Sequence, residues 1–114
     1  MLEKTVLRRK SDFALVYNKG KSVPERYIVF FVRKNGLSYN RTAFLASKKV
    51  GNSVTRNRAR RLMKESYREL KENIASGYDL IFVARKTIYN LKCADVKKSM
   101  EAAIRKTELH LKKA

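Results

Sequence analysis

The chain has 114 residues, which suits one domain with one hydrophobic core, so we expect residues 1–114 to form a single domain. Lys and Arg outnumber Asp and Glu by 28 to 10, the formal net charge is +18, and 44% of the residues are hydrophobic. The composition excludes a disordered tail. The charge favours nucleic acid over a membrane surface as partner, because a compact chain this basic repels itself unless an anion relieves it.

The sequence shows no pattern typical of a membrane span, a secretory signal, a disulfide or a cysteine-based metal site. No apolar run approaches the roughly 20 residues that span a bilayer, and residues 1–4 do not resemble the apolar core of a secretory signal. The single cysteine, Cys93, excludes an internal disulfide and a cysteine-based zinc cluster. We therefore expect a cytoplasmic protein, with Cys93 buried just before a helix and the single histidine, His110, near the end of one.

Residues 1–10 form a basic segment. Its cations are Lys4, Arg8, Arg9 and Lys10. Two interpretations stay open for this arm: an extended segment that contacts phosphate, or a solvated terminus.

The first helix is expected over residues 11–20, with Ser11 as N-cap and Gly20 just past its end. Phe13, Val16 and Tyr17 fall on one face of this helix. That stripe either packs in the core or forms an aromatic ledge on which bases stack.

Three strands are expected from β-branched and aromatic content. Residues 27–32 are apolar on both alternating faces, so the second face is either covered by the first helix or forms the floor of a cleft. After a turn at Asn35-Gly36, residues 41–47 form a second strand, antiparallel to the first. Residues 78–84 form the third, after Gly77 ends the preceding helix.

The central helix is expected to follow a basic turn over residues 47–53 and to run from about residue 56 to 74 or 75, capped by Asn52, Ser53 or Thr55. Its free N–H groups favour a phosphate at this end. At 100° per residue, three arcs separate. The apolar arc is Ala59, Leu62, Met63, Leu70 and Ile74, the basic arc is Asn57, Arg60, Arg61, Lys64, Arg68 and Lys71, and the acidic arc is Glu65, Glu69 and Glu72.

The basic arc contains like charges four residues apart, Arg60 with Lys64 and Lys64 with Arg68, which destabilise a helix by a few tenths of a kcal/mol each. Pairs of Arg61 with Glu65 and Arg68 with Glu72 compensate only part of the charge. The helix is therefore predicted to present a positive strip to a polyanion.

A final amphipathic helix is expected to start near Asp95 and to include Val96, Met100, Ala103, Ile104, Thr107 and Leu111. The predicted order is αββαβα, an α+β domain in which helices pack on one sheet.

The run over residues 47–61, Ser-Lys-Lys-Val-Gly-Asn-Ser-Val-Thr-Arg-Asn-Arg-Ala-Arg-Arg, resembles the signature of the protein subunit of bacterial ribonuclease P. The resemblance covers nearly the whole chain and extends to Asp12-Phe13, Tyr17, Gly20, Ser22-Val23 and Ala84-Arg85-Lys86. It implies a fold close to the second domain of ribosomal protein S5, with a left-handed βαβ crossover that contains the Arg-rich helix.

The resemblance also implies a function. Ribonuclease P removes the 5′ leader of precursor tRNA by metal-assisted hydrolysis, and its RNA subunit supplies the catalysis and holds the Mg²⁺. The protein, expected as one copy per RNA, binds that RNA and the leader, and thereby improves substrate affinity and broadens substrate use.

Site residues follow from the positions that match the family, and none is implied to be catalytic or to ligate metal. Those implied to bind RNA are Lys48, Lys49, Arg56, Asn57, Arg58, Arg60, Arg61, Lys64 and Arg68. Arg58 departs from the basic arc and falls near the acidic one. Phe13, Tyr17 and Phe31 match the leader-binding cleft.

Two other functions remain compatible with the composition. One is a structural RNA-binding protein of ribosomal type. The other is a metal-dependent nuclease that acts alone and uses Glu65 or Asp79, but the ten acidic residues are scattered and the chain has only one histidine.

Overall fold

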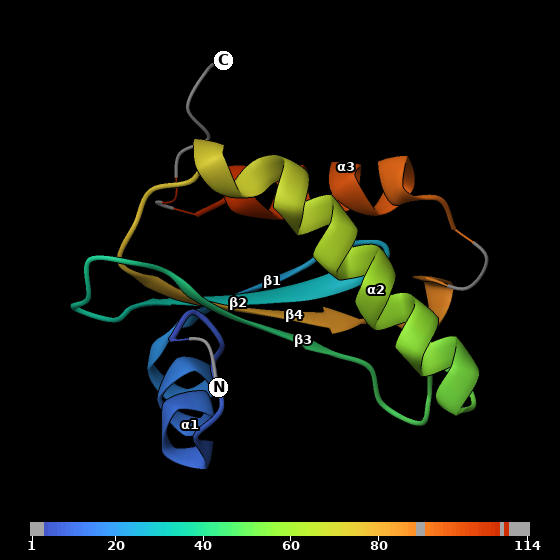
Figure 1. Ribbon diagram of the computed structural model, residues 1–114, viewed down its shortest axis with the longest axis horizontal. Coiled ribbons are helices and arrows are strands. Elements are labelled where there is room, and N and C mark those ends of the chain that lie inside the picture. The colour runs from blue at the N-terminus through green and yellow to red at the C-terminus, as the bar shows by residue number, and fades with distance from the viewer. Residues whose placement is uncertain (1–3, 89–90, 108, 110–114) are drawn as a thin grey trace.

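The computed structural model describes residues 4–88, 91–107 and 109, so His110 and Leu111 lie outside the described residues. One four-stranded sheet has α2 and α3 on one face and α1 on the other (Figure 1). The elements in chain order are α1 (Lys10–Lys19), β1 (Lys21–Pro24), β2 (Ile28–Lys34), β3 (Arg41–Leu45), α2 (Ser53–Leu70), η1 (Lys71–Asn73), β4 (Tyr78–Ala84), η2 (Lys86–Ile88) and α3 (Cys93–Arg105). The predicted α+β class is confirmed.

The strand order is β1-β2-β4-β3, in which β2 is antiparallel to β1 and β4, and β3 and β4 are parallel. Because α2 connects β3 to β4, it lies in the expected βαβ unit. The hand of this crossover and the likeness to ribosomal protein S5 remain predictions.

Two features of the predicted order αββαβα need correction. The prediction lacks β1, a four-residue edge strand that contains Pro24 and buries only Val23. The second predicted strand, β3, does run opposite to β2, but β4 lies between them, so the turn at Asn35-Gly36 does not join neighbouring strands.

The sheet face under α2 and α3 is sealed. Ile28 and Phe30 of β2 and Leu80 and Phe82 of β4 are fully buried in the main core. The Phe82 ring stacks between Phe30 and Phe44, with centroid distances of 4.8 and 5.5 Å. Alternate residues of both strands therefore form the core with the two helices.

The opposite face is only partly covered. Val16 of α1 packs with buried Ala43 and Ile81 in a second, smaller cluster. Four apolar side chains on the same face remain half-buried: Phe31, directly opposite Ile81, and Val29, Leu45 and Val83, one step farther along the strands. The interpretation that the first helix covers this face is correct for part of it, and the cleft floor remains a prediction for the half-buried rest.

Helix ends differ in detail from the prediction. The N-cap of α1 is Arg9 rather than Ser11, and no side chain caps it. Gly20 is extended, with φ −86°, rather than left-handed. Glycine is required at this position because the backbone is closely approached: a Cβ there would lie 2.5 Å from the carbonyl oxygens of both Val16 and Val32. Gly77 does not end the central helix as predicted, because α2 runs from Ser53 to Leu70 and η1 stops at Asn73; its φ of +94° instead suits a chain reversal before β4.

The other two helices begin with side-chain hydrogen bonds. Asn52 caps α2 and accepts a hydrogen bond from the Thr55 N–H at 3.0 Å. In α3, Asp95 accepts from the Lys92 N–H at 3.2 Å, and the helix starts at Cys93, two residues earlier than expected. Within the described residues, no helix is both long and apolar enough to cross a membrane.

Candidate nucleic-acid interface

The basic strip of α2 points away from the core, as its arcs predict. Ala59, Met63 and Leu70 are buried together with Ser66. Ser66 is tolerated there because its hydroxyl donates to the Leu62 carbonyl oxygen at 2.8 Å. Asn57, Arg58, Arg61, Lys64 and Arg68 are exposed, and Arg56 and Arg60 are half-buried.

Much of the charge on this strip is not neutralised. Arg61 and Lys64 make no ion pair with any described residue. Arg68 pairs with Glu65 at 2.7 Å, so the expected pairs of Arg68 with Glu72 and Arg61 with Glu65 are wrong. A pair this exposed contributes little, roughly 0.2–1 kcal/mol. The strip therefore keeps most of its positive charge for a partner.

Arg56 and Arg60 lie in more restricted positions. Arg60 donates a hydrogen bond to the side-chain oxygen of Asn57. The Nε of Arg56 is buried and has no hydrogen-bond partner in the structure. Arg60 is therefore tied to the second turn of α2 by Asn57, whereas Arg56 has a buried donor that no described residue satisfies.

The basic turn before α2 places Lys48 and Lys49 in solvent. The Val50 N–H donates to the Ser47 carbonyl oxygen at 3.0 Å, which closes the turn. Gly51 follows with φ +151°, and a Cβ there would lie 2.9 Å from the Thr55 Cβ. The turn thus leads directly into the capped, positive end of α2.

Phe13, Tyr17 and Phe31, expected in one cleft, do lie together. The ring centroids of Phe13 and Tyr17 are 6.3 Å apart, and Tyr17 meets Phe31 edge-on at 4.9 Å. The Tyr17 side chain is 43% exposed, and partial burial raises the pKa of its hydroxyl, which stays neutral near pH 7. These three rings and the half-buried Val29, Leu45 and Val83 lie on the sheet face that α1 partly covers; we call this set of six residues the aromatic cleft, after the cleft that the resemblance implies.

A groove of about 240 Å³ connects the aromatic cleft with the basic strip. It is lined by Phe13 of α1, by β3, by the N-terminal segment, and by Arg60 and Lys64 of α2. Rings and cations therefore face one continuous hollow along the β3 edge of the sheet.

The N-terminal segment is more ordered than either interpretation of the basic arm suggests. The Leu7 N–H donates to the Thr42 carbonyl oxygen at 2.9 Å, and the Thr42 N–H donates to the Thr5 carbonyl oxygen at 2.8 Å. Val6 thereby forms a parallel bridge with Thr42, and Leu7 is buried. The apolar pair Val6-Leu7 among the cations is the signal that could have predicted this docking.

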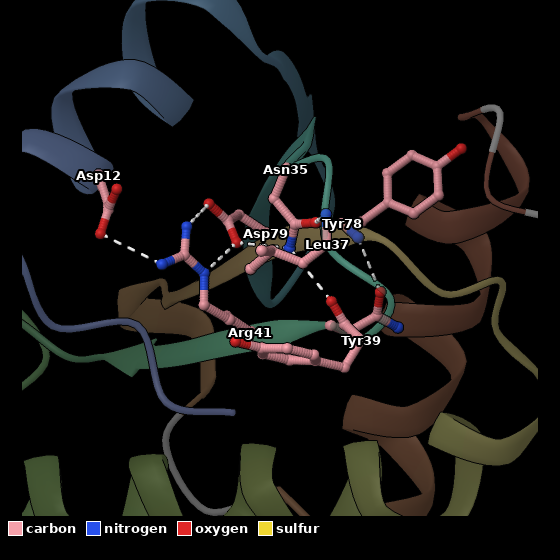
Figure 2. Close-up of polar contacts among 8 residues, drawn as sticks. Asp12, Asn35, Leu37, Tyr39, Arg41, Tyr78 and Asp79 are labelled. Carbon is pink, nitrogen blue, oxygen red and sulfur yellow. Dashed lines mark hydrogen bonds and ion pairs between the residues drawn. The ribbon is translucent and has the colours of Figure 1, made fainter. Parts of the chain in front are cut away.

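An arginine that the sequence analysis did not single out fastens α1 to the sheet. Arg41 Nε and a terminal nitrogen donate to the two Asp79 carboxylate oxygens at 2.8 and 2.7 Å, and another nitrogen lies 3.3 Å from Asp12 of α1 (Figure 2). Asp79 is only 2% exposed. Its hydrogen bond raises the pKa of Arg41, which remains a cation. Asp12 precedes Phe13, so this network positions the aromatic cleft.

Asparagines complete this network and hold the loop between β2 and β3. Asn35 donates to Asp79 at 3.0 Å and to the Tyr39 carbonyl oxygen at 3.2 Å (Figure 2). Asn40 accepts from the Tyr78 N–H at 2.8 Å and donates to the Ala75 carbonyl oxygen at 3.0 Å. Because Arg41 and Asn35 both donate to it, the Asp79 carboxylate has protein partners on both of its oxygens.

Cys93 is half-buried and is the first residue of α3 rather than a buried residue before it. Its sulfur lies 3.3 Å from the Ser66 hydroxyl oxygen, so it takes part in the contact between α2 and α3. Over the described residues, no three His, Cys, Asp or Glu side chains are grouped so that they could hold a metal ion.

Comparison with known proteins decides the family. The family model for ribonuclease P matches residues 1–108. The chain belongs to the ribonuclease P protein family. The ribonuclease P protein component of Caldanaerobacter subterraneus is 44% identical over 109 residues, which are 96% of this chain and 94% of that protein. The component of Clostridioides difficile is 41% identical over 106 residues, which are 92% of this chain and 93% of that protein.

Solved structures agree with this assignment. The ribonuclease P protein of Staphylococcus aureus has a TM-score of 0.82 and 27% identity, covering 93% of this chain and 97% of that one. The Thermotoga maritima protein has a TM-score of 0.81 and 29% identity, covering 90% of this chain and 97% of that one. The function of the chain is that of the protein subunit of ribonuclease P, the ribonucleoprotein of tRNA 5′ processing.

Proposed function

We propose that the basic strip of α2 and the basic turn bind the catalytic RNA of ribonuclease P, while the aromatic cleft binds the 5′ leader of precursor tRNA. The observation that carries this proposal is the continuous hollow in which Phe13 faces Arg60 and Lys64. The hollow would place the two RNAs side by side, because the bases of a single-stranded leader stack on rings and the phosphates of the catalytic RNA attract cations.

The basic strip suits a structured RNA. Its cations are spread along α2, and phosphate contacts of this kind fix position and orientation without reading sequence. Aromatic rings suit the leader, since every base has a face that can stack, at roughly 1–3 kcal/mol per base. The protein would then accept precursors with different leader sequences, which is the broadened substrate use that the family resemblance implies.

Hydrolysis, in this proposal, is performed by the RNA subunit with Mg²⁺ held mainly by RNA phosphates, and one protein binds one RNA in the cytoplasm. The arrangement of the two leading acidic candidates supports it: Asp79 is buried against Arg41, and Glu65 is paired with Arg68. Neither is poised to activate water at the aromatic cleft. The contribution of the protein is affinity for the precursor and support for metal binding by the RNA.

Cleavage of a precursor tRNA at low Mg²⁺ tests this proposal, with the RNA subunit alone, the protein alone, and the two together. We expect the mature 5′ end to appear mainly in the mixture. A variant with Arg60, Lys64 and Arg68 changed to Gln should stimulate poorly, whereas Lys98→Gln, on the exposed side of α3, should stimulate normally. Cleavage by RNA-free protein, or no stimulation by folded wild-type protein, would contradict the proposal.

A further inference from the structure

A second group of cations lies at the edge of the sheet opposite to β3. Lys19 ends α1, Lys21 begins β1, and Arg33 and Lys34 end β2. Together they line a groove of about 720 Å³, and no acidic residue is among the described residues that line it. We call this the β1-edge groove. It shares no residue with the hollow beside α2.

The charges in the β1-edge groove are largely uncompensated. Lys19, Arg33 and Lys34 make no ion pair within the described part of the chain. The Lys21 ammonium donates to the carbonyl oxygen of Lys106 at 2.6 Å, which fixes its position but does not neutralise it. Asp79 lies opposite Arg33 in the register of β2 and β4, but its carboxylate is already bound by Arg41.

Four like charges around one groove repel one another, and a bound polyanion would relieve that repulsion. The cations come from the end of α1, the start of β1 and the end of β2, and Lys21 lies opposite Val32 in the register of β1 and β2, so the four charges gather at one end of this sheet edge. Several cations that line one open groove of this size suit the successive phosphates of a nucleic-acid backbone.

The groove continues from the aromatic cleft. Along one face of β2, Val29 lies in the floor of the cleft, Phe31 meets Tyr17, and Arg33 lines the groove, because alternate residues of a strand share a face. We propose that the β1-edge groove binds the phosphodiester backbone of the leader where the strand continues past the aromatic cleft.

This inference rests on the proposed function, since it extends the leader site. The test compares two double variants that each lose two exposed cations and so carry +16 instead of +18. The groove variant is Lys19→Gln with Lys34→Gln, which leaves the Lys21 hydrogen bond intact. The matched control is Lys98→Gln with Arg105→Gln, on α3. Each is assembled with the catalytic RNA and titrated with mature tRNA and with precursors of increasing leader length, over a range of salt concentrations.

With wild-type protein, affinity should increase as the leader grows beyond the aromatic cleft. The groove variant should lose that increase, binding the longest leader about fivefold more weakly, with a salt slope lower by about 1.4 because two single-strand phosphate contacts are lost. Short leaders, mature tRNA and the control variant should behave as wild type does.

Two results would overturn the assignment. Groove and control variants could bind long leaders equally well, in which case the groove is only a solvated face. The groove variant could instead bind the catalytic RNA more weakly with no dependence on leader length, which would assign the groove to that RNA. Failure of the proposed function is distinguishable, because wild-type protein itself would then not prefer precursor to mature tRNA.

Discussion

The two faces of the sheet are built from alternate residues of the same strands, yet they differ in how much of their apolar surface is covered. Beneath α2 and α3, Phe30 and Phe82 are fully buried. On the α1 face, Phe31 and Val83, their neighbours along the strands, are half-buried. One short helix covers only part of that face. The difference shows that apolar content alone does not separate core from binding site; the extent of helical cover does.

The largest effect should come from opening the sealed face. Phe82→Ala removes a ring that stacks on both Phe30 and Phe44 and should lower the free energy of unfolding by about 3–5 kcal/mol. Phe31→Ala, on the open face, should lower it by about 1 kcal/mol, since its ring is already partly solvated. Urea denaturation of both variants measures this. Equal losses would mean that the two faces are equally part of the core.

The next effect concerns the charge on α2. Changing Arg60, Lys64 and Arg68 to Gln should weaken binding of the catalytic RNA on the order of a hundredfold. The salt slope should flatten by about one unit per lost phosphate contact, because fewer counterions are released. Filter binding from 50 to 200 mM salt would show both changes. An unchanged slope would mean that these cations do not contact phosphate.

A smaller and more selective effect is expected at the aromatic cleft. Phe13→Ala should weaken precursor binding about tenfold, within the roughly 1–3 kcal/mol of one stacked base, and leave mature tRNA affinity unchanged. Phe13→Leu keeps apolar packing without a ring and is the matched control, expected to bind the precursor almost as weakly. Equal loss for precursor and mature tRNA would return Phe13 to a purely structural role.

The smallest effect should come from loosening α1. Asp12→Asn removes the 3.3 Å ion pair with Arg41 but leaves Arg41 bound to Asp79. Because the pair is partly solvated, the expected loss of stability is about 0.5 kcal/mol. Thermal unfolding would detect it beside Glu101→Gln, which removes an exposed pair with Arg105. A loss of 3 kcal/mol or more would mean that Asp12 is as essential as a fully buried ion-pair partner.

Local sequence patterns predicted much of the fold correctly. The bounds of β4 match the predicted third strand, since its apolar run lies between Gly77 and a basic stop. In α2, the spacing of Ala59 and Met63 placed the core side correctly. Phe13, Tyr17 and Phe31 also meet as the family resemblance implied.

Features that depend on contacts between distant parts of the chain could not be predicted from local sequence patterns. The insertion of β4 between β2 and β3 has no local signal, and β1 is too short to show a period. Arg41 is one cation in a strand, and only the folded chain brings it to both Asp79 and Asp12. Gly20 does follow the last residue of α1 as predicted, but glycine is required there because the carbonyl oxygens of Val16 and of Val32 in β2 approach closely, and the approach of Val32 has no local signal.

Photocrosslinking in the assembled complex tests most directly whether the aromatic cleft and the basic strip bind different RNAs. A benzophenone amino acid would replace either Tyr17, in the aromatic cleft, or Arg61, on the basic strip, with catalytic RNA and labelled precursor present. Both side chains are exposed. We predict that position 17 attaches to the precursor leader and position 61 to the catalytic RNA. Attachment of position 17 to the catalytic RNA, with position 61 on the leader, would contradict the account.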